Sequence, residues 1–382
     1  MPFTPRFSYT HATVQQLGKI EAAKSVINLL PLPPDTSLRL RHDALQRSTH
    51  SSTQIEGNPL SEADVRRAIA AGDRRGTKAE QEVRNYWRAL NRVEEFAETY
   101  APITEKFIRE LHRIVIVLSR GRRGSRSDYR IVECPVVDTV TRRIDYGPPA
   151  PNDVPELMTE LVAWLNSAEA QRLPVPVRAA ILTHRFLSIH PFGDGNGRTG
   201  RLLATTELWR SSYRMRGFFS FDEYFNRDRD RYYRNLQMGL PVDFYEGRND
   251  PDHTPWVSYF IEVMAQAAGD LEARATSLHA TRQPEPAPWE RLPRRQQQIL
   301  TRLLSRLLEN SSSGLTINAS EVDAWFGISS RTAREWLKDW AEDGFVAPRL
   351  TSDTSRVREY ELREPWIEFL RSAEAIATLS DI

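Results

Sequence analysis

The chain has 382 residues, with 40% hydrophobic and 27% charged side chains and a net charge of +1. This composition is ordinary for a globular protein, long enough for two domains, and it excludes a fibrous or wholly disordered chain. A charge so close to zero gives the whole chain no attraction to nucleic acid or to anionic membranes, although it does not exclude a local basic patch.

The cysteine content and the N-terminus narrow the class of protein further. Cys134 is the only cysteine, which excludes an internal disulfide and a cluster of thiolate ligands to a metal. Residues 1–7 lack a charged stretch followed by an apolar one, and no run approaches the roughly 18 to 20 apolar residues of a membrane helix. We therefore expect a soluble, cytoplasmic protein without a membrane partner.

In chain order, the first 280 residues are expected to be mainly helical. Prolines within 29–34 end any helix before them, and a helix is predicted over 37–56, closed by Gly57. Ser61 then begins a capping-box pattern. The Val-, Ile-, Thr- and Tyr-rich segment 129–146 predicts a β-hairpin. Further helices are expected over 81–100, from Thr104 to Ile114, and over 154–165, 177–189, 198–210, 224–238 and 254–278, with a basic turn at 121–127.

The C-terminal part is predicted to be a separate module. The proline-rich segment 282–293 is expected to link domains of residues 1–281 and 294–382. In the second domain, the expected order of helices (295–308, 317–326, 329–343) and two strands within 345–362 resembles a winged helix-turn-helix. Such folds bind DNA, dock proteins or dimerise. The mixed charges of helix 329–343 favour protein docking or dimerisation over DNA contact. The sequence does not exclude DNA contact.

The most informative segment is HPFGDGNGRTGR, residues 190–201. Glycines on both sides of Asn196 allow successive backbone amides to turn inward as an anion-binding nest. The helix expected to follow adds the partial positive charge of its N-terminus. Arg198 and Arg201 are three residues apart, so they share a helix face and can hold phosphate oxygens. The segment therefore predicts a phosphate site.

Two further side chains of this segment can bind a metal ion or transfer a proton. Asp194 provides a carboxylate, and Mg²⁺ is commonly held by one or two carboxylates together with substrate phosphates. His190 can accept a proton near neutral pH. Together these groups indicate phosphoryl or nucleotidyl transfer to a hydroxyl, whereas a Walker A motif, a kinase signature set and an HExxH motif are absent from the sequence. His112 and His184 are predicted to be structural.

At every specified position, segment 190–201 resembles the signature of the Fic (fido) family, H-x-F-x-D/E-G-N-G-R-x-x-R. The resemblance covers roughly residues 10–280 and implies a mainly α fold, with a helical core at about 100–240 and a small β-hairpin flap. It implies that His190 deprotonates the acceptor hydroxyl and that Phe192 is buried. It also implies Mg²⁺ on Asp194 and ATP phosphates on Gly193, Gly195, Asn196, Gly197, Arg198 and Arg201.

The resemblance also implies roles for two other regions. The hairpin would present Val136, Val137 and Ile144 as a flap that aligns a target segment by strand addition. Tyr232 and Tyr233 fall where the family presents aromatic side chains toward adenine. Packing in the core is an equal alternative for both tyrosines, and the asparagine that the family pattern places downstream of them is not evident.

The segment Ser52-Thr-Gln-Ile-Glu56-Gly57 resembles a second family pattern, S/T-x-x-x-E-G/N. Ser52 and Glu56 are four residues apart and share a helix face, which by itself is typical of an ordinary exposed helix. The resemblance implies instead an inhibitory helix at about 37–57. Its Glu56 would pair with Arg201, remove that arginine from the γ-phosphate and leave ATP only a non-productive pose.

The resemblance implies a protein adenylyltransferase that transfers AMP from Mg-ATP to a Ser, Thr or Tyr hydroxyl of a target protein, and of itself, and is autoinhibited by Glu56. Gly195 and Asn196 favour an ATP-like donor, although relatives transfer UMP or phosphocholine. One alternative is a hydrolase that removes AMP at the same site. Another is a DNA-binding regulator that only senses nucleotide. The sequence is also compatible with a homodimer.

Overall fold

The computed structural model describes residues 2–72, 76–116, 128–137, 142–280, 292–309, 315–349, 357–364 and 366–370. The basic turn predicted at 121–127 lies outside these ranges, as does most of the linker predicted at 282–293. Within them the chain is mainly helical with small antiparallel sheets, which confirms the prediction of a mainly α fold. None of the helices in these ranges combines the length and the hydropathy of a membrane span.

Helices make up most of the elements. They are α1 (His11–Leu29), α2 (Pro34–Ile55), α3 (Glu62–Ala70), α4 (Lys78–Glu98), α5 (Glu105–Val115), α6 (Val154–Leu165), α7 (Ala168–Gln171), α8 (Val175–Ile189), α9 (Asn196–Arg210), α10 (Asp222–Arg227), α11 (Arg229–Gln237), α12 (Thr254–Ala280), α13 (Arg294–Glu309), α14 (Ala319–Phe326) and α15 (Ser330–Glu342). Short 3₁₀ helices are η1 (Pro151–Asp153), η2 (Met215–Gly217) and η3 (Phe244–Glu246). Strands β1 (Val136–Val137) and β2 (Ile144–Tyr146) form one sheet, and β3 (Thr316–Ile317), β5 (Glu359–Leu362) and β4 (Val346–Arg349) form another in that order.

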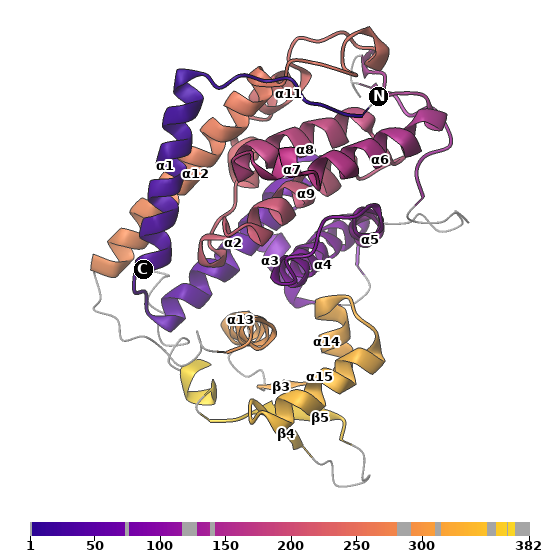
Figure 1. Cartoon of the computed structure of the whole chain (residues 1–382). Helices are drawn as coiled ribbons and strands as arrows, with labels where there is room; N and C mark the ends of the chain where they lie inside the picture. Colours follow the sequence, from indigo (N-terminus) through magenta and orange to yellow (C-terminus); the bar gives the residue numbers. More distant parts are fainter. Residues whose placement is uncertain are drawn as a thin grey trace.

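The middle of the helical region is the pair α8 and α9, and residues 190–195 connect the two helices. Every residue of α8 from Pro176 to Ile189 is buried, so α8 is the central helix. Helices α4 and α5 pack on α9, α6 and α12 pack on α8, and α1 runs along α12 (Figure 1). The connection between α8 and α9 is therefore held by a well-packed frame on several sides.

The C-terminal module, defined here as residues 294–370, lies at one end of the helical region beside α2 and α4 (Figure 1). Its hydrophobic core includes Leu38 of α2 together with Leu303 of α13 and Phe326 of α14. The guanidinium of Arg88 on α4 donates to the carbonyl of Ala324 at 3.1 Å. The module is thus packed directly onto α2, while its identity as a winged helix and the domain boundaries stay predictions.

Two local differences from the predicted elements have simple causes. Residues 224–238, predicted as one helix, form α10 and α11. Asp228 leaves the helical region (φ −138°, ψ 76°), and its side chain accepts the N–H of Arg231 as an N-cap. The helix predicted from Ile317 begins instead after Asn318, whose side chain caps α14 in a capping box, because Ile317 and its predecessor pair with β5.

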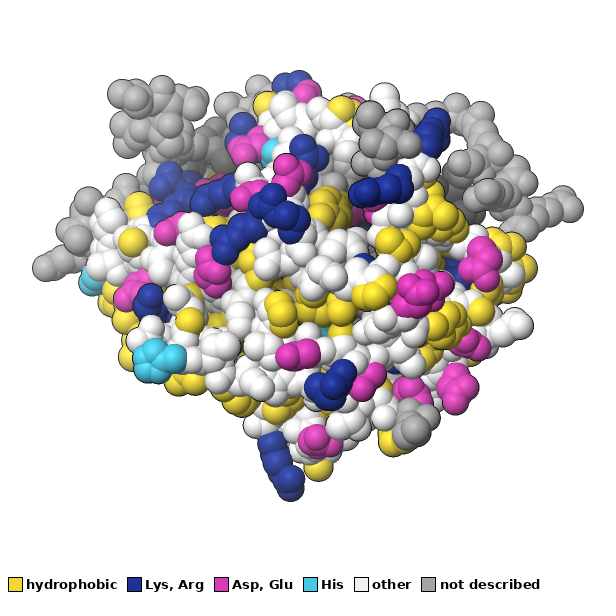
Figure 2. Space-filling model, turned by 90° about the horizontal axis from the view of Figure 1, so that it is seen from above, with side chains coloured by type: hydrophobic (Ala, Val, Ile, Leu, Met, Phe, Trp, Pro, Cys, Tyr) yellow, Lys and Arg dark blue, Asp and Glu magenta, His cyan; other side chains and the backbone are white. Residues whose placement is uncertain are grey.

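The face of the helical region turned away from the C-terminal module carries both signs of charge. Basic and acidic side chains are interspersed there, with hydrophobic side chains between them (Figure 2). This mixture agrees with the net charge of +1. It differs from the continuous basic stripe that a nucleic-acid groove requires.

Candidate active site

The segment between α8 and α9 is a tight loop closed by its own side chains. His190 lies just past the end of α8 in the left-handed region (φ 50°, ψ 56°), and its N–H donates to the carbonyl of Phe186 at 3.0 Å. Asn196 Nδ2 donates to the carbonyl of Phe192 at 2.7 Å, and Asn196 Oδ1 accepts the Phe192 N–H at 3.0 Å. The Asn196 side chain therefore shapes the loop, and its backbone amide is the group left to contact a phosphate.

A histidine on α5 supports this loop. The ring of His112 stacks on the buried ring of Phe192, with centroids 3.6 Å apart, and its Nε2 hydrogen-bonds the carbonyl of Asp194 at 2.9 Å. His112 thereby fixes both the aromatic anchor and the backbone of the carboxylate residue. His184 is buried in the core, with Nε2 3.2 Å from the carbonyl of Leu236. Both histidines have the structural surroundings that the sequence predicted.

The N-terminus of α9 has the features of an anion-binding site. Gly195 is its N-cap in the left-handed conformation (φ 79°), which a glycine adopts without strain. The first amides of a helix have no partner within that helix, and the helix dipole adds partial positive charge to them. Gly197 lies in this first turn, and a Cβ there would collide with the carboxylate of Glu56. Glycine at 197 therefore allows Glu56 to approach the amides of α9.

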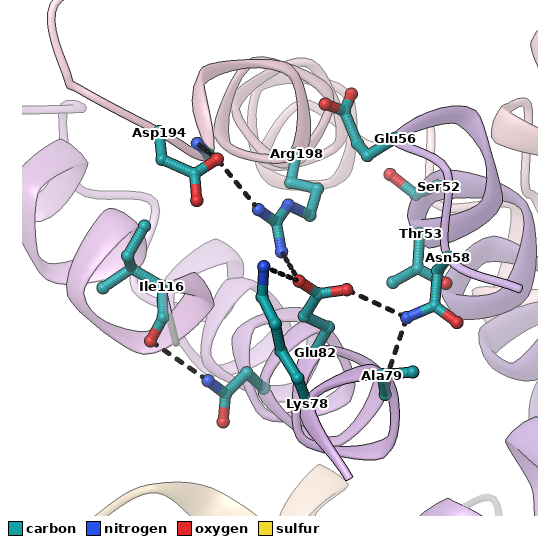
Figure 3. Close-up of polar contacts among 12 residues, drawn as sticks. Ser52, Thr53, Glu56, Asn58, Lys78, Ala79, Glu82, Ile116, Asp194 and Arg198 are labelled. Carbon is teal, nitrogen blue, oxygen red and sulfur yellow. Dashed lines mark hydrogen bonds and ion pairs between the residues drawn. The ribbon is translucent and has the colours of Figure 1, made fainter. Parts of the chain in front are cut away.

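Arg198 lies between two carboxylates (Figure 3). Its Nη2 donates to Asp194 Oδ1 at 3.4 Å, and its Nη1 is 3.9 Å from Glu82 Oε1 on α4. Glu82 also accepts a hydrogen bond from Asn58 Nδ2 at 3.0 Å and lies 3.7 Å from Lys78 Nζ. Glu82 and Asn58 orient Arg198, and sequence reasoning missed both because they come from segments far from the motif.

Arg201 is held by the end of α2. Its Nε donates to Ser52 Oγ at 2.7 Å, and its Nη2 donates to the Ser52 carbonyl at 2.8 Å and to Glu56 Oε1 at 2.9 Å. The guanidinium is 1% exposed and the Glu56 side chain is 30% exposed. The structure thus brings together Ser52, Glu56 and Arg201, the three residues that the inhibitory pattern linked. Gly57 follows in the left-handed region (φ 87°) and ends the helix.

A buried carboxylate near Arg201, that of Asp222, was not predicted from the sequence. Asp222, at the start of α10, has its Oδ1 3.8 Å from Arg201 Nε and accepts a hydrogen bond from Ser48 Oγ. Burial raises the pKa of Asp222 to about 6, although Arg201 and Ser48 oppose that rise. Burial alone would lower the pKa of Arg201, but Glu56 is the main neighbour that keeps it raised. Arg201 therefore stays charged.

His190 is placed to remain a neutral imidazole. Burial, and then the positive charge of Arg130, lower the pKa of His190 to about 4, against the opposing effect of Glu56 and Asp194. Arg130 Nε donates to the His190 carbonyl at 2.8 Å, and the Arg130 N–H donates to the carbonyl of Pro191 at 2.9 Å. Arg130 therefore fixes the backbone that carries His190 and also disfavours its protonation.

The predicted adenine-binding tyrosines lie in different surroundings. Tyr232 is 1% exposed and packs against Phe225 and Trp256. Tyr233 is 41% exposed, and its hydroxyl donates to the carbonyl of Ile55 at 3.2 Å. Tyr232 is thus a core residue beside Arg201, whereas Tyr233 contacts the end of α2. A contact of either ring with adenine stays a prediction.

The predicted flap is the sheet of β1 and β2. Val136 pairs with Tyr146 and Val137 with Ile144, with an irregularity between the two pairs. Residues 138–141 lie outside the described part of the chain. Val136, Val137 and Ile144 are 38%, 38% and 48% exposed. These short strands with exposed hydrophobic side chains suit the addition of a further strand, and the docking role stays a prediction.

The residues fit a magnesium ion that is shared with substrate phosphates. Within the described residues no cluster of three or more His, Cys, Asp or Glu side chains is present. The Asp194 side chain is 63% exposed beside the N-terminus of α9, and its Oδ1 accepts the N–H of Gly195 at 2.6 Å. One accessible carboxylate next to a phosphate site is a common arrangement for Mg²⁺, which retains several waters.

Comparisons with known proteins agree with this geometry. Residues 102–208 match the model of the Fic/DOC family, and this range contains segment 190–201. The protein adenylyltransferase Fic of Drosophila willistoni is 30% identical over 203 residues, which are 52% of this chain and 39% of that protein. The protein adenylyltransferase Fic of Drosophila yakuba is 28% identical over 267 residues, 69% of this chain and 49% of that protein. The chain therefore spans less than half the length of these relatives.

Solved structures show the same fold. A crystal structure of a Fic family protein from Desulfovibrio desulfuricans has a TM-score of 0.59 at 22% identity and covers 95% of this chain and 99% of its own. A Fic domain containing signaling protein from Bacteroides thetaiotaomicron has a TM-score of 0.58 at 26% identity and covers 70% of this chain and 97% of its own. The family match, the shared fold and the loop geometry of residues 190–201 together show that this chain contains a Fic/DOC domain, matched over residues 102–208.

Proposed function

We propose that the chain is a protein adenylyltransferase that transfers AMP from Mg-ATP to a Ser, Thr or Tyr hydroxyl of a target protein and of itself. One observation carries the proposal: His190, Asp194 and Arg198 converge on the N-terminus of α9, with Arg201 one turn further along. The names of the Drosophila relatives support AMP as the transferred group.

Unused hydrogen-bond donors in this region support a phosphate-bearing substrate. Arg198 Nε and Arg201 Nη1 are buried, and neither has a hydrogen-bond partner among the described residues. A buried donor without a partner carries a free-energy cost that an acceptor in a ligand removes. Phosphate oxygens at the N-terminus of α9 would lie in reach of both donors, which is how the arginines would hold the β- and γ-phosphates.

The chemical step then follows from these positions. The acceptor hydroxyl oxygen bonds to the α-phosphorus of ATP while its proton moves to the imidazole of His190. The bond between the α-phosphorus and the bridging oxygen breaks, and pyrophosphate leaves with the negative charge that Arg198 and the amides of α9 stabilise. The neutral state of His190 is the state that can accept this proton.

Mg²⁺, bound through Asp194, would neutralise charge on the α- and β-phosphates. Replacing Asp194 with alanine is expected to lower magnesium-dependent transfer by about tenfold or more, because no other carboxylate lies in the motif to take over the ion. Transfer rates across a magnesium titration, with Asp339→Ala on the exposed face of α15 as the control, measure the effect. Activity that neither EDTA nor Asp194→Ala alters would refute this role.

The lowered pKa of His190 has a measurable consequence. Because the pKa is lowered to about 4, the neutral base persists as the pH falls below the ordinary histidine range and is lost only near the lowered value. The Cε1–H resonance of His190, assigned by its absence from His190→Asn, is expected to stay constant from about pH 8 to about 5.5. A titration midpoint near 6.5 in the free protein would contradict the proposed environment.

Autoinhibition by Glu56 is the second part of the proposal. Glu56 and Ser52 occupy three of the hydrogen bonds that Arg201 can make, and a γ-phosphate would have to replace the carboxylate at the same guanidinium. The position of Glu56 against Gly197 also favours an alternative, in which its carboxylate directs a water that removes AMP from a modified protein. A target docked by strand addition at β1 and β2 fits either direction of reaction.

The C-terminal module gives less support to the DNA-binding alternative. On the exposed face of α15, Arg331 pairs with Glu335 at 3.1 Å and Lys338 lies 3.7 Å from Glu342. Basic side chains that are already paired with carboxylates make a weak phosphate-binding face. We therefore propose protein docking or homodimerisation for this module.

Incubation with ATP radiolabelled at the α-phosphate, with Glu56 intact and with Glu56→Gly, distinguishes the three functions. Incorporation of label into the chain or a target supports transfer. Loss of label from a protein that was modified beforehand, faster with Glu56 intact, supports removal. Nucleotide binding without either reaction supports sensing and would overturn the proposed enzyme activity.

A further inference from the structure

Three polar side chains follow one another along the face of α2 that is turned toward α9 and α10. Ser48, Ser52 and Glu56 are four residues apart, so each lies about one helical turn beyond the last. Ser48 Oγ donates to Asp222 of α10, whereas Ser52 and Glu56 both accept from Arg201 of α9. The end of α2 therefore contacts two opposite charges, the carboxylate of Asp222 and the guanidinium of Arg201.

The Asp222 carboxylate is enclosed and has one hydrogen bond from a neighbouring side chain. Its side chain is 1% exposed, and its Oδ2 accepts from Ser48. Oδ1 has no hydrogen-bond partner among the described residues, and it lies 3.8 Å from Arg201 Nε in an ion pair. Arg201 is also 1% exposed, so solvent screens this attraction weakly. A carboxylate buried in this way requires a positive neighbour, and Arg201 fills that place.

Glu56 and Asp222 approach the guanidinium of Arg201 from different sides. Glu56 Oε1 accepts from Nη2 at 2.9 Å, whereas Asp222 faces Nε, which donates to Ser52 Oγ. Arg201 Nη1 is buried and has no hydrogen-bond partner in the described part of the chain. A withdrawal of Glu56 would therefore free a donor of Nη2 beside Nη1, while Asp222 would still face Nε. The edge formed by Nη1 and Nη2 can bind two phosphate oxygens at once.

Asp222 also leaves the charge of Arg201 compensated when Glu56 is absent. A buried guanidinium without a carboxylate is costly, and that cost favours any rearrangement that takes the charge elsewhere. Asp222 belongs to α10, so it stays beside Arg201 whether or not the side chain at position 56 is a carboxylate. The two carboxylates are thus suited to different tasks: Glu56 covers the donors of the guanidinium, and Asp222 keeps the guanidinium in place.

We propose that Asp222 is a positioning residue that holds the Nε side of Arg201, so that Nη1 and Nη2 face the terminal phosphate of the nucleotide once Glu56 withdraws. The inference rests on the proposed function, in which Arg201 binds the γ-phosphate. Asp222 acts only through Arg201. Its loss is therefore expected to affect a nucleotide that has a γ-phosphate and to spare one that lacks it.

Calorimetric titration of the full-length Glu56→Gly variant tests the proposal, with the α,β-methylene analogues of ATP and ADP as ligands in the presence of Mg²⁺. Neither analogue can be cleaved next to the α-phosphorus, so AMP transfer does not disturb the measurement. Adding Asp222→Asn is expected to weaken binding of the ATP analogue by about three- to tenfold and to leave the ADP analogue within about twofold. Asparagine has a similar shape and can still accept from Ser48, but it has no charge. Asp339→Asn, the same exchange on the exposed face of α15, is the control and is expected to change neither affinity.

A pH series separates the charge of Asp222 from a purely structural contribution. Burial raises the pKa of Asp222 to about 6, against the opposing effects of Arg201 and Ser48. Tyr86 and Tyr232 also face Asp222, but burial raises the pKa of both, so they stay uncharged. The carboxylate is therefore charged above about pH 6 and neutral below it. The two variants are expected to differ in affinity for the ATP analogue at about pH 7.5 and to converge near about pH 5, since the phosphates of the analogue titrate alike for both.

The same titrations can contradict the proposal. An equal loss of affinity for both analogues would indicate a general effect on the fold, and tighter binding of the ATP analogue would show that Asp222 only repels phosphate. Asp222→Asn is expected to add nothing when Arg201 is already alanine, and a further weakening there would show that Asp222 does not act through Arg201.

Two results distinguish this inference from the proposed function. If Arg201→Ala leaves the affinity of Glu56→Gly for the ATP analogue unchanged, Arg201 does not bind the γ-phosphate, and the inference fails with that contact. If the effect of Asp222→Asn is confined to the ATP analogue but no AMP transfer from ATP is found, the positioning role holds and the proposed enzyme activity fails.

Discussion

Replacing Glu56 with glycine is expected to raise self-modification by about 10- to 100-fold. A hydrogen bond to a charged group contributes about 1.5 to 3 kcal/mol, and each 1.4 kcal/mol changes a population tenfold. The Glu56 carboxylate is 30% exposed, so solvent screens its pairing with Arg201, and the larger cost of breaking a fully buried pair does not apply. ATP affinity is expected to change little, because under the proposed mechanism the inhibited protein still binds ATP, but in a non-productive orientation.

Two companion variants show whether Arg201 is the group released. Glu56→Gly combined with Arg201→Ala is expected to lose the gain, since the freed guanidinium is then missing. Ser52→Ala removes only the hydroxyl that accepts from Arg201 Nε and is expected to give a smaller gain than Glu56→Gly. If Glu56→Gly is no faster than the unaltered chain on itself or on a target, the inhibitory role is wrong. If it is slower at removing AMP, the hydrolytic alternative is favoured.

Loss of the His190 imidazole is expected to lower AMP transfer by about 10²- to 10⁴-fold, the usual contribution of a positioned base. The effect is measured in the Glu56→Gly background, where the unimpaired rate is high. Nucleotide binding is expected to persist, because Asp194, Arg198 and the amides of α9 stay in place. Transfer at the rate of the parent variant would rule out His190 as the base.

The backbone at His190 requires a matched control for this experiment. Its left-handed conformation (φ 50°) strains an alanine, so His190→Ala could disturb the loop as well as remove the base. Asparagine adopts this conformation more readily and is not a base at any relevant pH. His190→Asn and His190→Ala are therefore expected to show the same loss. A large loss in His190→Ala alone would indicate a change of loop structure.

The parts of the molecule that sequence reasoning predicted well depend on local chemistry. Ser61 and Thr104 cap their helices as their side chains suggested, and α6 has the predicted bounds because its prolines and apolar spacing lie within one short window. A phosphate site could be predicted from segment 190–201 for the same reason, since the groups proposed to bind phosphate lie within twelve residues of one another. The pairing of Glu56 with Arg201 came instead from the family resemblance.

What the sequence did not predict depends on contacts between distant segments. Glu82, Asn58 and Asp222 reach the site from α4, the turn after α2 and α10, and nothing in their local sequence marks them. Helix α1 was not assigned bounds because its apolar residues do not gather on one face. The break between α10 and α11 was missed because Asp228 falls within a helical pattern and acts there as a cap.

The most direct test of the central claim compares two labelled forms of ATP with the Glu56→Gly variant. One form carries radiolabel at the α-phosphate and the other at the γ-phosphate, with Glu56→Gly/His190→Asn as the control for non-enzymatic labelling. Transfer of AMP predicts that protein becomes labelled from the α-form and not from the γ-form, and that the double variant shows little of either. Labelling from the γ-form would show phosphoryl transfer instead, and no labelling from either form would contradict the proposed activity.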